Sequence, residues 1–374
     1  MSQHEGFNVN MGLRGEVDWQ LIDSATEQVV MEGHQDNLIT NYGLDAIGTN
    51  GIVHGYNTSG NTGYLRSGFR IYACVGTGTT PPAITDTTLA AETGRSATAG
   101  PDTMTPTSPT PGEWRVPIQF EIPESVGNGN LREWGFSNGA GPGAVVIRGL
   151  FKDANGNDIT VTKTDQQKLR LTHTLIVTAS AAAKTVTAVV IPFTGDVTNR
   201  SGKYVMVRNT SVSIHGASSK SDLDGFSNMA SGLYVTLGAI TQAPAAGNLS
   251  FTMADGNAGI VNAWKRAFPS AYVSGSYERN FPELMFDTAD LVGATIYGFA
   301  HGAQWSASDS YRAVIRTEFD AGQEFVKDNL HRIYVTGGKV TWGERNHGAK
   351  VFLNRWRERD YVGRSDKGSR HVRH

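Results

Sequence analysis

Carboxylates and aromatic residues, the side chains most suited to glycan chemistry, gather in one stretch of the second half of the chain. The carboxylates belong to Glu278, Glu283, Asp287 and Asp290, and the aromatic residues nearby are Trp264, Tyr272 and Trp305. A glycan-cleaving enzyme needs two carboxylates about 5–10 Å apart, beside aromatic platforms, whereas a glycan-binding surface needs the aromatic residues alone. Since spacing along a chain does not establish convergence in space, ordinary packing with solvated charges is the preferred interpretation, and we assign no catalytic residue.

Three further patterns could hold a ligand, and each has a simpler interpretation. The glycines of VGTGTT are followed by two prolines, and neither a helix nor a Lys-Ser/Thr pair follows directly, so a phosphate cradle is not expected. Oxygen-bearing residues alternate in DANGND, residues 153–158, but the glycine is misplaced for a calcium loop and the residue types suit a hairpin turn. His173 lies among apolar residues and is expected to be buried and hydrogen-bonded. No cofactor and no metal are expected.

The C-terminal residues 350–374 carry eight Lys and Arg against three acids, a net charge of +5. Arginine and aromatic side chains together are typical of interface anchors. The expected interface residues are Phe352, Arg355, Trp356, Arg357, Arg359 and Tyr361. The alternative is a frayed, solvated end, which is common at chain termini. We favour an arm that docks on an acidic neighbour.

The bulk properties limit the scaffold that carries these residues. A length of 374 residues predicts two domains at about 150 residues each. The 44 glycines, with much Thr, Ser and Asn, favour strands and turns over helices. The net charge of −2 argues against the whole molecule as a nucleic-acid partner, and Cys74, the single cysteine, cannot form an internal disulfide and is expected to be buried. No signal peptide and no membrane-spanning run is recognised, so synthesis and folding in a cytoplasm are expected.

Alternation of apolar and polar residues predicts strands in both halves. GEVDWQLID and EQVVMEG form a hairpin around the turn DSAT. In EWRVPIQFEIPE, the even-numbered residues 114–122 share one face, and Pro117 favours an edge position because it lacks a backbone donor. The odd-numbered residues 169–177 share the face of another strand. Thr336-Gly337-Gly338-Lys339 is predicted to be a tight hairpin turn.

Three short helices are predicted. The first lies within DNLITNYGLDAIG, residues 36–48, where Thr40 or Asn41 can cap it and Gly48 can end it. The second follows Asp86 and ends near Gly94. The third is NAGIVNAWKRAF, residues 257–268.

These elements predict an all-β fold with two β-sandwich-like domains, long loops rich in Gly, Ser and Thr, and a few short helices. The expected divisions are an assembly domain at residues 1–180, a second β-rich domain at residues 181–353, and a basic arm at residues 354–374. The small-residue stretch TASAAAK marks the expected boundary near residue 180.

Five phrases of the N-terminal half resemble, in the same order, the tail and fibre structural proteins of tailed bacteriophages. They are GEVDWQLIDSATEQVVMEGHQDNLITNYGLDAIG, VGTGTTPPAITDTTLAAETGR, NLREWGFSN, VVIRGLFKD and ITVTKTDQQKLRLTHTLIV. The resemblance covers about residues 12–178. It implies a structural protein of the virion, in the tail, the collar or the fibre attachment.

The expected function is therefore self-assembly and docking in a virion, with other copies of the chain and other virion proteins as partners and no membrane contact. DNA contact is expected only through the basic arm. The alternative is a receptor-binding fibre or spike that contacts a host-surface glycan. A glycan depolymerase is a third interpretation, which long β-helical repeats would favour, and the sequence has no such repeats.

Deletion of residues 354–374 is expected to leave a folded protein that fails to join the particle. The melting temperature should change little, and docking of the full-length chain should weaken with salt, because screening shortens to about 3 Å at 1 M. Loss of Trp356 should weaken docking more than loss of one rim charge. Normal incorporation of the truncated chain into virions would contradict a docking arm, and failure to fold would place these residues in a core.

Overall fold

The computed structural model describes residues 7–50, 70–98, 100, 107, 109–110, 112–179, 184–192, 198–206, 231–236, 264–266, 270–281, 283–303, 312–335 and 337–344. Within these ranges the chain is mostly strand and contains one α-helix, α1 (Asn41–Asn50). The predicted all-β fold class is confirmed. No helix of the described residues is long and apolar enough to cross a membrane.

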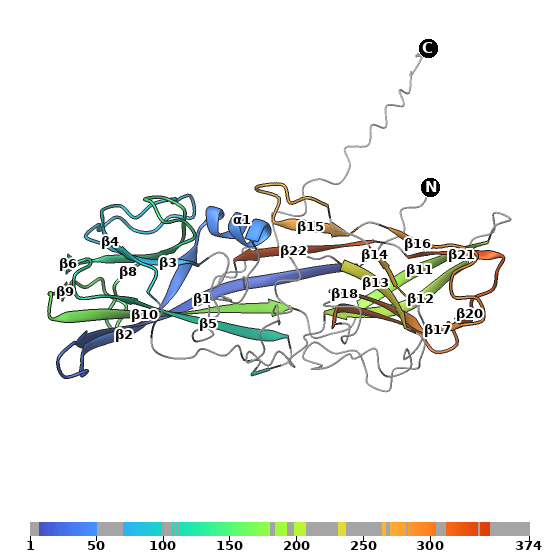
Figure 1. Ribbon diagram of the computed structural model, residues 1–374, viewed down its shortest axis with the longest axis horizontal. Helices are drawn as coiled ribbons and strands as arrows, with labels where there is room; N and C mark the ends of the chain where they lie inside the picture. The colour runs from blue at the N-terminus through green and yellow to red at the C-terminus, as the bar shows by residue number, and fades with distance from the viewer. Residues whose placement is uncertain are drawn as a thin grey trace, which may run out of the picture. The chain divides into compact units, whose positions relative to one another are not determined.

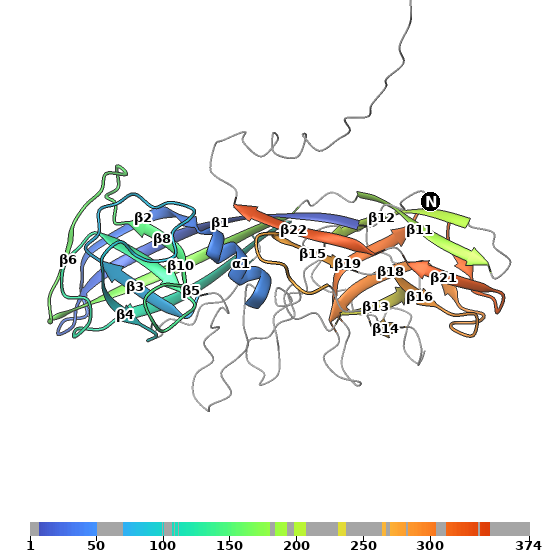
Figure 2. The ribbon, with the colours of Figure 1, turned by 90° about the horizontal axis from the view of Figure 1, so that it is seen from above.

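The first sheet has ten strands, and residues from both ends of the described chain build it (Figures 1 and 2). In hydrogen-bonded order its main path runs β15 (Glu278–Phe281), β22 (Gly338–Glu344), β1 (Phe7–Asp23), β2 (Val29–Ile39), β8 (Val145–Leu150), β7 (Glu133–Ser137), β3 (Tyr72–Gly76) and β4 (Glu92–Ser96). Off this path, β10 (Gln167–Ala179) pairs with β1 and with β5 (Glu113–Ile122).

Strand β1 organises this sheet because it pairs with three other strands. β10 runs antiparallel to it along residues 11–23. Along residues 15–22 it pairs antiparallel with β2, in the predicted hairpin, and along residues 7–13 it pairs parallel with β22. Since a strand has two edges, β22 and β2 must follow one another along the edge opposite β10. The last strand described is thus joined to the first.

Alternating apolar residues form the core of the first sheet, as the period of two predicts. On β1, Val17, Trp19 and Leu21 are buried, and on β10 all the odd-numbered residues 169–177 are fully buried. The even-numbered residues 116–122 of β5 face the same core. Pro117 lies on β5, opposite Thr174 of β10. Within the described chain β5 pairs with no strand other than β10, so β5 lies at an edge of the sheet and the predicted edge position of Pro117 is confirmed.

Cys74 lies in this region as a fully buried free thiol on β3. Burial raises its pKa to about 12, with a smaller contribution from the negative charge of Glu92. The thiol is therefore neutral and enclosed at physiological pH, which confirms the expected apolar role.

The second sheet has eight strands and begins after β10. In hydrogen-bonded order they are β14 (Trp264–Arg266), β13 (Ser231–Thr236), β18 (Gly298–Ala303), β19 (Arg312–Phe319), β12 (Thr198–Met206), β11 (Lys184–Pro192), β21 (His331–Val335) and β16 (Leu284–Phe286). Two ribbons complete the described strands, β17 (Thr295–Ile296) with β20 (Phe325–Val326), and β6 (Gly129–Leu131) with β9 (Val161–Lys163). The chain changes sheet between β10 and β11, near residue 180, but β15 and β22 return to the first sheet.

Helix α1 confirms the first predicted helix, and Thr40 caps it. The Thr40 hydroxyl accepts a hydrogen bond from the Gly43 amide at 3.0 Å, and its carbonyl accepts one from Leu44. Leu44 and Ile47 form the buried apolar face, but the helix continues past Gly48 to Asn50.

The other two predicted helices are wrong where the structure describes them. After Asp86 the chain stays irregular and enters β4 at Glu92, because the amides of Ala90 and Ala91 donate to the Glu133 carboxylate and not to helical carbonyls. In the third, residues 264–266 form β14, paired with β13, and residues 257–263 and 267–268 lie outside the described chain.

The predicted hairpin turn at residues 336–339 is also wrong. β21 pairs with β11 and β16 of the second sheet, whereas β22 pairs with β1 and β15 of the first. The two strands are adjacent in sequence but separate into different sheets. Local turn chemistry predicted that the two strands would pair with each other, and the partners available elsewhere in the chain decided the pairing instead.

Replacement of Trp342 by alanine is expected to destabilise the fold by about 3–5 kcal/mol. Trp342 lies on β22, is 5% exposed, stacks at 5.5 Å on Tyr272 and donates from Nε1 to the Leu44 carbonyl at 2.9 Å. Urea unfolding followed by tryptophan fluorescence and circular dichroism measures the change. Thr341→Ala, one position away on the opposite face, is the control, and an equal loss in both variants would contradict the assigned packing.

Candidate functional site

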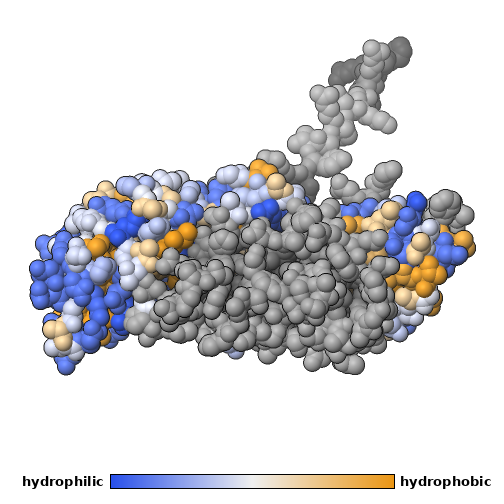
Figure 3. Space-filling view, in the orientation of Figure 1, coloured by the Kyte–Doolittle hydropathy of each residue, from blue (hydrophilic) through white to orange (hydrophobic). Residues whose placement is uncertain are grey.

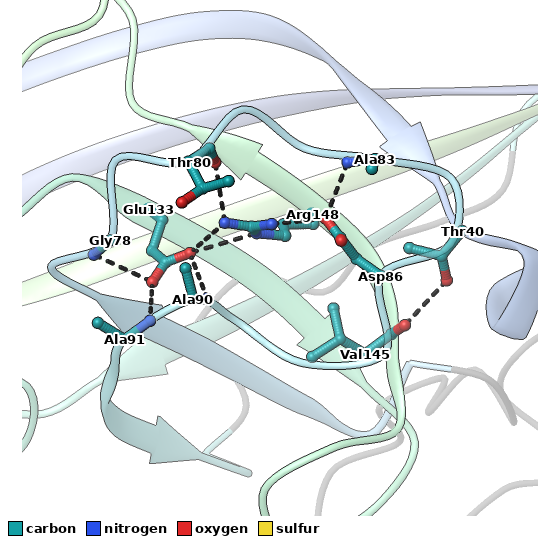
Figure 4. A network of polar contacts seen from close by, with 10 residues as sticks. All are labelled: Thr40, Gly78, Thr80, Ala83, Asp86, Ala90, Ala91, Glu133, Val145 and Arg148. Carbon is teal, nitrogen blue, oxygen red and sulfur yellow. Dashed lines mark hydrogen bonds and ion pairs between the residues drawn. The ribbon is translucent and has the colours of Figure 1, made fainter.

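A fully buried carboxylate organises the loop between β3 and β4. Glu133, the first residue of β7, is 0% exposed. Its Oε1 accepts hydrogen bonds from the amides of Gly78 at 3.1 Å and Ala91 at 2.6 Å. Its Oε2 accepts from the Ala90 amide at 3.0 Å and from Nη2 of Arg148 at 2.8 Å (Figure 4). One carboxylate therefore joins the two ends of residues 78–91, a segment that has no helix or strand of its own.

Arg148, on β8, fixes the middle of the same loop. Its side chain is 3% exposed, and it donates to Glu133 through both Nε and Nη2. Nη2 also donates to the Thr80 carbonyl at 2.9 Å, and Nη1 pairs with the Asp86 carboxylate. Asp86 in turn accepts from the Ala83 amide at 2.8 Å. We call these residues, Gly78, Thr80, Ala83, Asp86, Ala90, Ala91, Glu133 and Arg148, the loop network.

The glycines of the VGTGTT phrase are explained by this carboxylate. A Cβ atom at Gly78 would lie 2.4 Å from Glu133 Oε1, and one at Gly76 would lie 2.4 Å from the Ala91 carbonyl oxygen. Only glycine allows the backbone to approach an anion this closely. The phrase does cradle an anion, but the anion is a side chain of the same protein, so this position holds no external phosphate.

The loop network continues into helix α1 through Thr40. The Thr40 hydroxyl donates to the Val145 carbonyl at 2.9 Å (Figure 4), and the Asn41 amide donates to the Ile84 carbonyl at 2.7 Å. The loop, the helix cap and strand β8 are thus mutually constrained. The Ile84 side chain is 43% exposed on the outer side of the loop, and Tyr42 is 36% exposed at the start of α1.

Residues from the second half of the chain hold the other side of α1. Asp45 accepts hydrogen bonds from the Tyr272 hydroxyl, the Ser274 hydroxyl at 2.9 Å and the Gly275 amide at 2.7 Å. Arg279 donates to the Gly48 carbonyl at 2.6 Å. Burial, and then the hydrogen bond to Asp45, raise the pKa of Tyr272 well above its usual range, so its hydroxyl stays a donor. Helix α1 is therefore a junction between segments far apart in the sequence.

The carboxylates singled out in the sequence do not form one cluster of converging acids. Glu278 lies on β15 of the first sheet and pairs with Lys339 at 3.2 Å. Asp287 follows β16 of the second sheet and pairs with Arg332 at 2.9 Å. Asp290 accepts from the Asp287 amide at 2.7 Å, and Glu283 is exposed.

The aromatic residues that lie near these carboxylates in the sequence do not line a described platform, in keeping with the preferred interpretation of ordinary packing. Tyr272 packs on Trp342 beneath α1, and Trp264 lies on β14. Trp305 lies outside the described residues, as do the interface residues predicted in the arm, Phe352, Arg355, Trp356, Arg357, Arg359 and Tyr361. That interface stays a prediction.

His173 is buried and hydrogen-bonded, as predicted. Its Nε2 lies 3.1 Å from Asn37 Oδ1, and its Nδ1 contacts the buried guanidinium of Arg70. Burial, and then the charge of Arg70, hold the pKa of His173 well below its usual range, so the imidazole is neutral. Burial also lowers the pKa of Arg70 to about 9.

The DANGND phrase is the predicted turn. The Asp153 amide donates to the Asn157 carbonyl at 2.9 Å, and the Asp153 carboxylate accepts from the amides of Asn155 and Asn157. These bonds hold the Asp153 carboxylate on the backbone of its own turn. Within the described residues, no group of three or more His, Cys, Asp or Glu side chains is arranged to hold a metal ion.

Sequence reasoning missed Glu133 and Arg148, although a signal was present. Each is a charged residue in a run of otherwise buried strand positions, EWGFS and VVIRGL, whose members are all buried in the structure. Charged residues are rarely fully buried unless they are paired. Two such residues in neighbouring strands could have been proposed as partners of each other.

The fold and the loop network define an all-β protein whose irregular surface loop is held by a buried ion pair. Comparison of the chain with protein-family models, with curated proteins and with solved structures found no match.

Replacement of Arg148 by methionine is expected to destabilise the protein by about 3–5 kcal/mol, because it leaves the Glu133 charge buried without its partner. The double variant Glu133→Gln with Arg148→Met should lose less than the sum of the single variants. Lys152→Met is the matched control, since it removes the exposed Lys152–Asp158 pair and should cost less than about 1 kcal/mol. Urea unfolding measures the free energy of unfolding of Arg148→Met, Glu133→Gln, the double variant and Lys152→Met. Equal losses in Arg148→Met and Lys152→Met would contradict the importance of the buried pair.

Proposed function

We propose that this protein is a structural component of a tailed-phage virion, in the tail, the collar or the fibre attachment, and that it acts by self-assembly and docking. The observation that carries the proposal is the loop network. Its members come from phrases that resemble phage tail and fibre proteins: the loop from VGTGTTPPAITDTTLAAETGR, Glu133 from NLREWGFSN, and Arg148 from VVIRGLFKD. Thr40, from the first phrase, bonds to Val145 beside them. The resemblance thus falls on residues that contact one another.

The outer surface of residues 77–91 is poor in charged residues. Apart from Glu133 and Arg148 beneath it, the loop network contains one charged residue, Asp86, which is paired with Arg148. The exposed residues are Thr, Pro, Ala and Ile84. Interface centres are depleted of charged residues, and a loop that is already ordered loses little conformational entropy on binding. The loop with Tyr42 is the proposed docking surface for other copies of the chain or other virion proteins.

The proposed mechanism requires no catalysis. Buried surface between symmetric subunits would supply the free energy of assembly. The buried Glu133–Arg148 ion pair would hold the loop in the same conformation in every copy of the protein. Synthesis in the host cytoplasm and residence in the virion follow from the same proposal. The position within the particle follows from the copy number, since a closed ring favours the tail or collar and a trimer favours a fibre.

The direct test is the protein composition of purified phage particles. Quantitative mass spectrometry should find the chain in a fixed ratio to the major tail proteins, and immunogold labelling should place it on the tail, collar or fibre base. Detection only in the lysate and never in particles would overturn the proposal.

Replacement of Ile84 by aspartate is expected to block incorporation into particles without unfolding the protein. The side chain is 43% exposed, so the free energy of unfolding should change by no more than about 0.5 kcal/mol, whereas a charge at an apolar interface is costly. Val326→Asp, at a position 62% exposed on β20, is the matched control and should be incorporated normally. Particles that take up both variants equally would show that the loop is not the docking surface.

A further inference from the structure

A buried lysine at the β6–β9 ribbon is held by neutral oxygens. Lys163, the last residue of β9, is 1% exposed. Its Nζ donates to the carbonyls of Pro123 at 2.8 Å and Glu124 at 3.1 Å, and to the amide oxygen of Asn128 at 2.8 Å. The three donors of the ammonium therefore have three acceptors, and none of them carries a charge.

This arrangement leaves the ammonium charge incompletely compensated. Burial lowers the pKa of Lys163 to about 8, and the more distant carboxylates of Glu124 and Asp165 oppose this shift only in part. A negative charge at Asn128, in direct contact with Nζ, would form the ion pair that the site lacks. A buried cation with a bonded carboxylate is more favourable than one with neutral oxygens alone.

Asn128 is positioned to acquire that charge. It is exposed, and Gly129 follows it with φ of +121° and open space where a Cβ would lie. Glycine offers the least steric hindrance to attack by its own backbone nitrogen on the preceding side chain. Figure 3 shows hydrophilic residues gathered on the side of the view where Figure 1 labels β6 and β9, and Asn128 itself is exposed to solvent.

We propose that Asn128 is a self-modification site, at which Lys163 promotes deamidation of the amide to a carboxylate. The Gly129 nitrogen bonds to Cγ of Asn128 and gives its proton to solvent. The bond from Cγ to the amide nitrogen breaks, and that nitrogen takes a proton and leaves as ammonia. Water then opens the cyclic imide to aspartate or isoaspartate, so the net reaction consumes one water and releases one ammonia.

Lys163 acts at two points of this sequence. The ammonium touches Oδ1, the oxygen on which negative charge develops when the Gly129 nitrogen attacks Cγ, and so stabilises the tetrahedral intermediate electrostatically. When hydrolysis opens the imide to aspartate, the new carboxylate lies at Cγ and the same ammonium pairs with it. The reaction thus completes the ion pair in the folded protein and not in an unfolded chain, where the two residues are not held together.

The chain contains two internal comparisons in its described residues. Asn138 precedes Gly139 and Asn155 precedes Gly156, and these glycine amides donate to Ser137 Oγ at 3.1 Å and to the Asp153 carbonyl at 3.0 Å. Gly129 is likewise constrained, since it pairs with Lys163 in the β6–β9 ladder, so the comparison depends on the lysine contact. Neither asparagine amide is bonded to a lysine: Asn138 Oδ1 accepts from the Tyr42 hydroxyl. Both asparagines should react more slowly than Asn128.

The test is peptide mass spectrometry of the full-length protein during incubation at neutral pH. Asn128 should deamidate faster than Asn138 and Asn155 in the same sample. Lys163→Met should slow deamidation at Asn128 by about tenfold, less than the loss at a fully enclosed oxyanion site, and Lys163→Arg should retain most of the rate. Denaturation of the wild-type protein should remove the advantage of Asn128, which provides a measurement that does not depend on the folding of any variant.

Asn128→Asp provides an independent readout, because it creates the carboxylate without the reaction. It should raise the melting temperature at pH 7, and combination with Lys163→Met should abolish that gain. Three results would overturn the proposal: deamidation at Asn128 no faster than at Asn155, an unchanged rate in Lys163→Met, or a peptide in which Lys163 and Asn128 are joined with loss of ammonia. The last would identify Nζ, and not the Gly129 nitrogen, as the nucleophile.

Discussion

The backbone pairing of β1 is the constraint on which the rest of the first sheet depends. Its donors and acceptors are shared among β10, β2 and β22, and the parallel pairing with β22 requires a strand from the far end of the described chain. Parallel neighbours cannot be joined by a tight turn, so everything between Asp23 and Gly338 must fold in a way that returns β22 to this edge. Trp342 and Glu344 then reach α1 and the end of β2, where Glu344 accepts from the Ile39 amide.

The loop network solves a second problem, which is how a long irregular segment keeps one conformation. Residues 78–91 form no helix or strand, and their backbone amides need acceptors. The Glu133 carboxylate supplies two oxygens to three of those amides, and Arg148 balances its charge while it satisfies the Thr80 carbonyl. A buried positive charge has the same effect at Lys163, where the ammonium donates hydrogen bonds to three oxygens of residues 123–128 and so holds that segment in place. Charges buried in this protein serve mainly to organise backbone.

Short-range patterns predicted the parts of the fold that short-range forces control. The alternation in residues 114–122 and 169–177 identified buried faces, since a strand exposes successive side chains to opposite sides whatever its neighbours are. Thr40 was recognisable as a cap because its hydroxyl acts within three residues. The turn at residues 153–158 and the burial of His173 followed from residue type and local context.

The errors share one physical cause, which is competition from distant partners. The helix expected after Asp86 is absent because Glu133, more than forty residues away, takes the amides of Ala90 and Ala91. The hairpin expected at residues 336–339 is absent because β21 and β22 find better partners in different sheets.

The sequence by itself determined the fold class, the principal buried faces, the first helix and its cap, and the order of phrases on which the proposed virion role rests, because each depends on residue type and near spacing. Only the tertiary structure decided that β22 pairs with β1, that the glycines of VGTGTT enclose Glu133, and that Lys163 touches Asn128. Each of these contacts joins residues whose separation along the chain carries no periodic signal, so a single sequence does not encode them in a readable form.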